Sequence, residues 1–327
     1  MVLINFLPLW QKKIVMEYLL LIVGFVLLTF AADWLVDGAS GLAKRLNVSD
    51  LVIGLTIVAF GTSAPELVVN VVATAQGTSQ IALTNVLGSN IINTLVILGL
   101  SAVFCPIACQ RNTFRYEIPL SFLAGFMVLV FGVCTKEINR LAGIVLLAFF
   151  VLFLVYSVYQ AKSGAIDEIG DVTKKMKIWK ALLLIVVGLV GLVAGGNLIV
   201  DNAVSIAQSW GVSEAVIGVT IVALGTSLPE LATSVIAAIK KNTDLAIGNV
   251  IGSNIFNIFF ILGLSSSISS LPVYPNFVVD ASVAAGSSLL LWLFVAFSRK
   301  RELNRWAGLV MLLCYAAYLA WLFAHIK

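Results

Sequence analysis

The sequence predicts an all-α membrane protein with ten transmembrane helices, arranged as two inverted repeats of five helices each. Composition is the first observation behind this prediction: the chain of 327 residues is 61% hydrophobic and 11% charged, whereas soluble domains are about 25% charged. The second is a set of ten apolar stretches, each near the roughly 20 residues that a helix needs to cross a bilayer. The third is an internal repeat, because the second half of the chain matches the first at an offset of 164 residues.

The apolar stretches are predicted to be helices rather than barrel strands, because they are long and few glycine–proline turns separate them. In chain order they lie at about 17–36, 51–75, 80–101, 117–134, 141–159, 180–200, 215–238, 244–268, 277–297 and 306–324. Spans 1–5 form the first half (1–160) and spans 6–10 the second (180–327), with a charged linker at 161–179. Five is an odd number, so the second half enters the membrane from the opposite side, which makes the repeat an inverted one.

The basic residues predict the orientation. Fifteen of the 20 lysines and arginines lie in the links after spans 1, 3, 5, 7 and 9, and five lie on the side of both termini. Cytoplasmic loops carry the excess of Lys and Arg, so we expect a multi-pass protein of the plasma membrane (the inner membrane of a bacterial cell), with linker 161–179 in the cytoplasm and both termini outside. Lys12 and Lys13 oppose this orientation, because they flank span 1 on the outer side. Residues 1–15 are assigned no function.

The first and sixth spans carry carboxylates near their predicted ends. Span 1 ends in Asp33 and Asp37, and Asp201 repeats Asp37 at the end of span 6. We interpret these as solvated helix-end residues, because polar side chains collect at the ends of spans.

Spans 2 and 7 carry a duplicated motif. Residues Gly61–Glu66 read GTSAPE, and Gly225–Glu230 read GTSLPE. Pro65 has no N–H, so the Gly61 carbonyl loses its helical partner and the proline ring pushes the helix open. We therefore expect both spans to be interrupted, with free carbonyl oxygens that line a cavity or bind a ligand.

Each motif ends in a carboxylate at membrane depth. An uncompensated charge there costs several kcal/mol, so Glu66 and Glu230 are predicted to bind a cation. Thr62 and Ser63 precede Glu66 by four and three residues, which allows all three to share a helix face. A plain proline kink with hydrogen-bonded hydroxyls would leave the duplicated glutamates unexplained.

Spans 3 and 8 carry a second duplicated motif. Residues Asn85–Asn93 read NVLGSNIIN, and Asn249–Asn257 read NVIGSNIFN. Ser89 and Asn93 lie one helical turn apart, as do Ser253 and Asn257. Gly88 and Gly252 allow close approach of a neighbouring helix, and the amides could also serve as interhelical hydrogen bonds.

The remaining reactive residues argue against an enzyme. The single histidine, His325, lies at the tail, which excludes a zinc-protease helix motif and a Ser–His triad. Cys105 and Cys109 lack the partners of a zinc site. Basic residues lie in loops between spans, so no nucleic acid is expected as a partner, and no resident cofactor is implied.

Two copies of G-T-S-x-P-E, each followed by G-S-N-I-x-N, resemble the alpha-repeats of the sodium/calcium exchanger family. The resemblance covers all ten spans, and the lack of a large cytoplasmic loop makes the chain similar to compact microbial members. It implies that Glu66 and Glu230 bind calcium and that Thr62 and Thr226 contribute oxygens. The implied sodium ligands are Ser63, Ser89, Asn93, Ser227, Ser253 and the carbonyls of Ala59 and Ala223. It also implies alternating access by sliding of spans 1 and 6.

One position departs from several relatives, which carry an aspartate where this chain has Asn257. Both halves here carry asparagine, Asn93 and Asn257, which argues against potassium co-transport and against a third carboxylate. We include the Asn257 amide oxygen among the neutral oxygens of the cation site.

The chemistry favours sodium-driven calcium transport and leaves alternatives open. Calcium prefers six to eight hard oxygens, and the two glutamates neutralise one calcium ion. We expect exchange of three sodium ions for one calcium ion, with Ca2+, Na+ and the bilayer as partners and no protein partner required, so that a monomer suffices. A calcium/proton antiporter would use the same glutamates as proton carriers. A channel would need a continuous pore, and a membrane scaffold would not explain the carboxylates.

Overall fold

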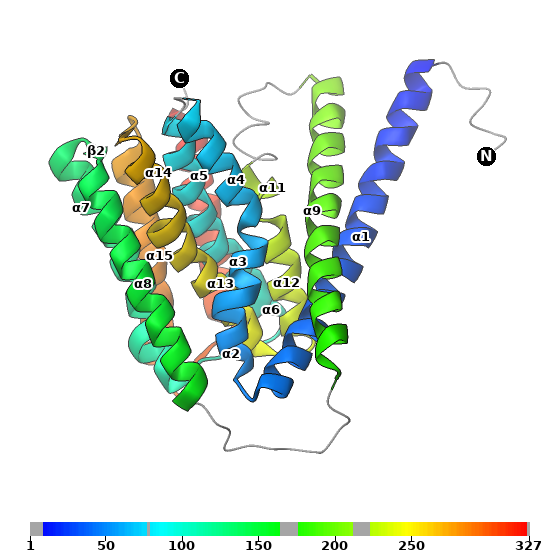
Figure 1. Cartoon of the computed structure of the whole chain (residues 1–327). Coiled ribbons are helices and arrows are strands. Elements are labelled where there is room, and N and C mark those ends of the chain that lie inside the picture. The colour runs from blue at the N-terminus through cyan, green and yellow to red at the C-terminus, as the bar shows by residue number, and fades with distance from the viewer. Residues whose placement is uncertain (1–8, 77–78, 164–175, 212–222, 326–327) are drawn as a thin grey trace.

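The computed structural model describes residues 9–76, 79–163, 176–211 and 223–325. Within these ranges the chain is helical apart from four two-residue strands (Figure 1). In chain order the elements are α1 (Leu9–Leu46), α2 (Asp50–Ile53), η2 (Gly54–Val58), α3 (Ala59–Thr62), α4 (Ala64–Ala75), α5 (Ser79–Ile91), η3 (Ile92–Leu98), α6 (Gly99–Phe104), β1 (Ile107–Ala108), η4 (Thr113–Glu117), α7 (Ile118–Thr135), β2 (Glu137–Ile138), α8 (Arg140–Ser163), α9 (Ile178–Ser209), α11 (Ala223–Gly225), α12 (Leu228–Ile239), α13 (Thr243–Ile255), η6 (Phe256–Leu262), α14 (Gly263–Ile268), β3 (Leu271–Pro272), α15 (Phe277–Phe297), β4 (Glu302–Leu303) and α16 (Arg305–His325).

Most of the predicted spans are present as membrane-length helices. In the described part of the chain, eight helices are long and apolar enough to cross a bilayer, and the bent pair Asp50–Thr62 and Ala64–Ala75 makes a ninth. The predicted seventh span is represented by the short apolar helix α12, because its first half falls on 212–222, outside the described residues.

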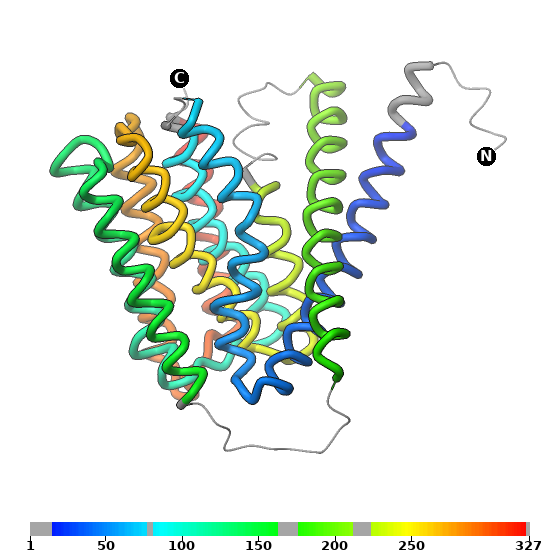
Figure 2. The backbone as a smooth tube through the Cα atoms, in the orientation of Figure 1, coloured from blue at the N-terminus to red at the C-terminus, as the bar shows by residue number. Residues whose placement is uncertain are grey.

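Helices α1 and α9 form a closely packed pair at one edge of the molecule (Figures 1 and 2). Small residues bring their backbones together: a Cβ on Gly195 would lie 2.9 Å from the Leu28 nitrogen, and one on Gly188 2.9 Å from the Ala31 oxygen. Both helices are longer than predicted. Asp37 and Asp201 therefore lie within helices rather than at their ends, which corrects the interpretation of these carboxylates as helix-end residues.

The centre of the molecule is formed by the third and eighth spans. Of the most apolar window in each span, 78% is buried for Ile81–Phe104 and 94% for Thr243–Ile268, against 17% for Arg305–Ala324. The two spans that carry the GSNIxN motif are thus enclosed by the other helices. The polar residues of that motif, Ser89, Asn90 and Asn93 in one span and Ser253, Asn254 and Asn257 in the other, are buried.

The two halves are built from matching pieces. Helices α4 and α12 have 12 residues each, α5 and α13 have 13, and the π-helical segments η3 and η6 have seven. Asn139 and Asn304 each accept a hydrogen bond at 2.9 Å from the backbone nitrogen three residues on, which caps α8 and α16 in the same way. The π-helical segments are not predicted by the sequence pattern, although each begins two residues after the Asn of a GSN triplet, Asn90 or Asn254.

Contacts across the halves follow one pattern. Strand β1 pairs with β4 and strand β2 pairs with β3, both antiparallel. Gly143 packs against Gly263, and Gly99 packs against Gly308, with backbone oxygens close to where a Cβ would lie. When the two halves are exchanged, the β1–β4 pair corresponds to the β3–β2 pair, and the Gly143–Gly263 contact corresponds to the Gly308–Gly99 contact.

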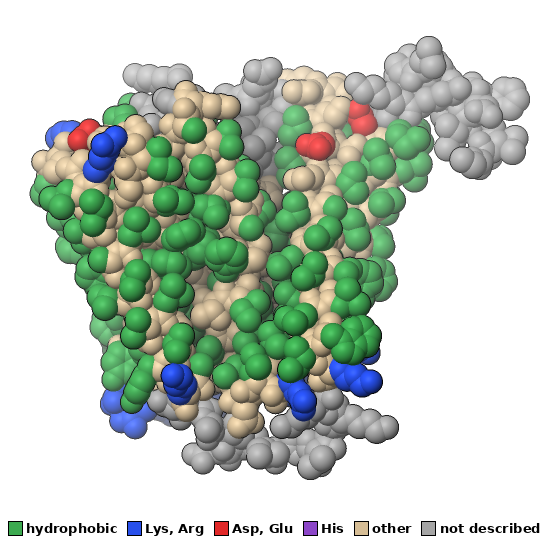
Figure 3. Space-filling view, in the orientation of Figure 1, with side chains coloured by type: hydrophobic (Ala, Val, Ile, Leu, Met, Phe, Trp, Pro, Cys, Tyr) green, Lys and Arg blue, Asp and Glu red, His purple; other side chains and the backbone are tan. Residues whose placement is uncertain are grey.

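The outer surface is apolar over the middle of the molecule, and basic side chains gather along its lower edge (Figure 3). Large hydrophobic side chains are exposed there, among them Leu141, Val155 and Val190. This is the surface that bilayer hydrocarbon requires. The protein is an integral multi-pass membrane protein.

Candidate ion-binding site

Both GTSxPE motifs interrupt their helices, as predicted. Helix α3 ends at Thr62, α4 begins at Ala64, and the two are bent by 47°. Ser63 between them has φ −85° and ψ 8°, and Ser227, between α11 and α12, has φ −88° and ψ 3°. The missing N–H of the following proline explains why both helices restart at the same motif position.

The two motif carboxylates are buried and lie near each other. Glu66 and Glu230 are each 1% exposed, and they are close enough for their charges to repel. Ser63 Oγ donates a hydrogen bond to Glu230 Oε1 at 2.9 Å, so the first motif contacts the carboxylate of the second. The described residues provide no lysine or arginine ion pair to either glutamate.

Asn249 joins the two motifs and was not among the predicted site residues. Thr62 Oγ1 donates to Asn249 Oδ1 at 3.2 Å, while Asn249 Nδ2 donates to Ser234 Oγ at 2.9 Å and to the Glu230 carbonyl at 3.4 Å. Its position at the start of the second repeated motif could have identified it, since a buried amide repeated in both halves needs partners.

Other amides of the central spans hold the halves together. Asn90 Nδ2 donates to the Asn254 carbonyl at 3.1 Å, and Asn254 Nδ2 donates to Thr94 Oγ1 at 2.8 Å. Asn257 Nδ2 donates to Asn90 Oδ1 at 3.1 Å, which leaves the Asn257 oxygen unused. The expectation that some amides serve as interhelical hydrogen bonds is confirmed.

Most of the predicted ligands have a buried oxygen without a hydrogen-bond partner. Such an oxygen is found on Glu66, Ser89, Asn93, Thr226, Ser227, Glu230, Ser253 and Asn257. Each buried unsatisfied polar group costs about 1–3 kcal/mol, and eight of the 18 such atoms among the described residues belong to the predicted ligand set. Coordination of cations would satisfy them together.

The packing brings these oxygens toward the two carboxylates. The Thr226 side chain lies beside Glu66, and the Ser253 side chain lies beside Glu230. Segment η3, which carries Asn93, packs against α12, and η6, which carries Asn257, packs against α4. Each glutamate helix is therefore covered by the π-helical segment of the other half.

The backbone ligands are placed less fully. Ala59 is 1% exposed, and its carbonyl accepts hydrogen bonds from Ser63 N at 3.0 Å and from Thr62 Oγ1 at 3.4 Å. Ala223 is the first residue of α11. No group of three or more His, Cys, Asp or Glu side chains occurs in the described residues, so a cation here would be held by two carboxylates and neutral oxygens.

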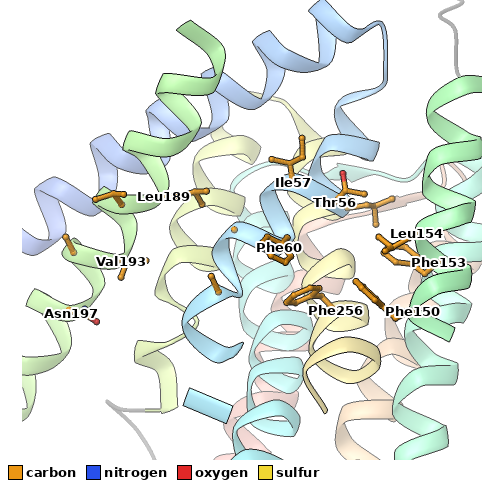
Figure 4. Close-up of a pocket in the computed structure, with 15 residues that line it drawn as sticks. Thr56, Ile57, Phe60, Phe150, Phe153, Leu154, Leu189, Val193, Asn197 and Phe256 are labelled. Carbon is orange, nitrogen blue, oxygen red and sulfur yellow. The ribbon is translucent and has the colours of Figure 1, made fainter. Parts of the chain in front are cut away.

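A large groove lies on the lipid side of the first helix break and is a separate feature (Figure 4). Its volume is about 860 Å³, and Phe60, Phe150 and Phe256 line it opposite Leu189 and Val193 of α9. It contains no charged side chain. This groove suits hydrocarbon, and neither Glu66 nor Glu230 lines it.

The fold and the site define a membrane protein with a buried, oxygen-rich site for cations at two helix breaks. The family model described as sodium/calcium exchanger protein matches residues 16–159 and 180–324. The chain is 40% identical to the putative antiporter CaxA of Alkalimonas amylolytica over 93% of this chain and 97% of that one. It is 33% identical to the sodium/calcium exchanger MaX1 of Methanosarcina acetivorans, over 95% and 99%.

The solved structure of the sodium-calcium exchanger NCX_Mj, soaked with Na+ and Sr2+, superposes with a TM-score of 0.82 at 34% identity, covering 94% of this chain and 99% of that one. The chain belongs to the sodium/calcium exchanger family, a family of antiporters. The resemblance read from the two motifs is confirmed.

Proposed function

We propose that this protein exchanges Na+ for Ca2+ across the membrane and that Glu66 and Glu230 carry the calcium ion. The observation that supports this most is the pair of buried carboxylates surrounded by oxygens without hydrogen-bond partners. Calcium is bound by carboxylate, carbonyl and hydroxyl oxygens, and those are the groups present. Thr62 and Thr226 add hydroxyl oxygens to the calcium site.

The sodium ions use many of the same groups. The proposed sodium ligands are Ser63, Ser89, Asn93, Ser227, Ser253, Asn257 and the carbonyls of Ala59 and Ala223. Because Ca2+ and Na+ share the glutamates, binding of one displaces the other, and the ions differ in which access state they stabilise. Competition for one site is what couples the two fluxes.

Charge favours a ratio of three sodium ions to one calcium ion. Two glutamates and one Ca2+ sum to zero, whereas two glutamates and three Na+ sum to +1. One net charge then moves in each cycle, which makes transport electrogenic and worth about 2.3 kcal/mol per 100 mV of membrane potential. Exchange of two protons for one calcium ion would be electroneutral.

We infer that access alternates between two inverted five-helix repeats, 1–160 and 180–327, which meet at the ion site. Matching element lengths, the two helix breaks and the exchange of strands between halves support this arrangement. Transporters of this kind place the substrate near the midplane at discontinuous helices. The protein lies in the plasma membrane. Its basic end faces the cytoplasm, because cytoplasmic loops carry the excess of Lys and Arg.

The test is calcium uptake into proteoliposomes of purified protein at clamped potential. With an outward sodium gradient alone, uptake is expected and should increase when the inside is made positive, because three Na+ leave for each Ca2+ that enters and one net positive charge moves outward. With a pH gradient alone, none is expected. Uptake that is driven by the pH gradient and insensitive to potential would identify a calcium/proton antiporter instead.

A further inference from the structure

Lys240 ties the edge helix α1 to the helix that carries Glu230. Lys240 follows the last residue of α12, and its Nζ lies 2.7 Å from Asp33 Oδ1, 2.6 Å from Asp37 Oδ1 and 3.3 Å from the Asp33 carbonyl oxygen. Partial burial alone would lower the pKa of the Lys240 ammonium, but the hydrogen bonds and charges of the two aspartates raise it above its ordinary value. The group is therefore charged at neutral pH.

Side-chain hydrogen bonds of Asn242 extend the same connection. Asn242 Nδ2 donates to Ser40 Oγ at 2.7 Å and to Asp50 Oδ2 at 2.6 Å. These bonds join the end of α1, the start of α2 and the link between α12 and α13. At this end α1 also packs extensively against α12.

The positions that correspond to Lys240 and its aspartates in the other half of the repeat do not form a matching ion pair. At an offset of 164, Lys240 corresponds to Gln76, and the aspartates Asp33 and Asp37 correspond to Asn197 and Asp201. Gln76 has no charge with which to bind Asp201. Helices α9 and α4, the counterparts of α1 and α12, make almost no contact with each other.

We propose that Lys240 is a gating residue, which holds α1 against α12 at the basic end of the molecule and so favours the state that is closed there. Two repeats with identical contacts would give two access states of similar free energy, because exchange of the halves converts one state into the other. This clamp, an ion pair of Lys240 at one end alone, makes the free energies of the two access states unequal. The inference rests on the proposed alternating access and adds which residue sets its equilibrium.

The effect is expected to be modest. The side chains of Lys240, Asp33 and Asp37 are 29%, 43% and 52% exposed, and ion pairs open to solvent contribute little. The structural readout is the distance between spin labels at Leu46→Cys on α1 and Tyr159→Cys on α8, in a chain with its four native cysteines replaced. Lys240→Gln, which copies Gln76, should add a second distance population to that of the parent.

Matched variants separate the clamp from surface charge. Lys241→Gln removes the same charge one residue away and should leave the distances unchanged, and Lys240→Arg should keep the parent distribution. Gln76→Lys, which offers a cation to Asp201 at the opposite end, should shift the populations in the opposite direction to Lys240→Gln. A distance distribution that Lys240→Gln leaves unaltered, or that Lys241→Gln alters equally, would overturn the clamp.

Transport gives the second readout. In Lys240→Gln the half-saturating calcium concentration should fall about two- to fivefold on the basic face and rise on the other, because a shift between two states changes the two faces in opposite senses. A change in the same direction on both faces would indicate structural damage and contradict the proposal. If Lys240→Gln shifts the distances but the protein shows no sodium-dependent calcium flux, the clamp stands and the proposed exchange of Na+ for Ca2+ is refuted. Failure of the clamp and failure of the proposed function are therefore distinguishable.

Discussion

At the scale of single residues, the polar groups of the centre fall into two kinds. The amides of Asn90 and Asn249 donate and accept hydrogen bonds between helices, so their substitution should affect folding first. The glutamates and several hydroxyls keep unused oxygens, so their substitution should affect ions first. Hydrogen-bond accounting thus separates structural from binding roles within one polar cluster.

The first prediction concerns the two carboxylates. Glu66→Gln and Glu230→Gln should each lower the apparent calcium affinity at least about a hundredfold, because one carboxylate cannot neutralise a divalent ion in a site of low dielectric, and a loss of about 3 kcal/mol corresponds to that factor. Calcium flux in proteoliposomes measures the loss, and thermal unfolding in detergent should show a folded protein. Asp201→Asn, which removes an exposed carboxylate, is the control and should transport normally. Near-normal flux in either glutamine variant would remove that glutamate from the site.

At the scale of elements, the central spans depend on a close crossing. A Cβ on Gly252 would lie 2.6 Å from the Leu55 oxygen and 2.7 Å from the Leu55 Cα, and 2.8 Å from the Ala59 Cβ. The expected close approach at Gly252 is confirmed. For Gly88, the partner that the repeat predicts lies at 219, outside the described residues.

The second prediction follows from this crossing. Gly252→Ala should destabilise the protein by about 2 kcal/mol or more, because backbone rather than a flexible side chain must move, and should weaken sodium binding by displacing Ala59. The melting temperature and the half-saturating sodium concentration are the measurements. Gly286→Ala, on a lipid-facing turn of α15 with nothing described within 4 Å of the added Cβ, is the matched control and should be neutral or slightly stabilising. Equal melting temperatures for the two variants would contradict the packing argument.

Sequence reasoning succeeded where one residue type has one physical effect. Pro65 predicted a break and the break is there, since a missing N–H acts locally. Sequence reasoning was insufficient where the environment of a side chain depends on a residue far away in the sequence. Asp33 and Asp37 were interpreted as solvated, and they are half-exposed, but their pairing with Lys240, about 200 residues further along the chain, was missed. The π-helical segments η3 and η6 were also not predicted, because their sequences, INTLVIL and FNIFFIL, contain no residue type that specifies a π-helix.

At the scale of the whole molecule, the charge distribution defines two ends. Basic side chains gather along one edge of the face shown in Figure 3, and α8 ends and α9 begins at that end in Figure 1. Because cytoplasmic loops are enriched in Lys and Arg, this asymmetry fixes the expected orientation.

The third prediction tests that orientation. In a chain without native cysteines, Lys136→Cys should react with an impermeant maleimide added to intact cells, whereas Lys177→Cys should react only after the membrane is opened. Both side chains are exposed, so the difference reports sidedness rather than burial. Transport activity of each variant is the control for folding. Labelling of residue 177 from outside would reverse the orientation.

The exchange of strands has a consequence for how the chain is held together. Ile107 pairs with Leu303 near one end, Ile138 pairs with Leu271, and all four side chains are fully buried. The hydrogen bond from Ser63 to Glu230 likewise joins one half to the other through space. In the inverted-repeat arrangement proposed above, a single five-helix unit would have half a site and unmatched strand edges, and it would need a second, inverted copy to complete both.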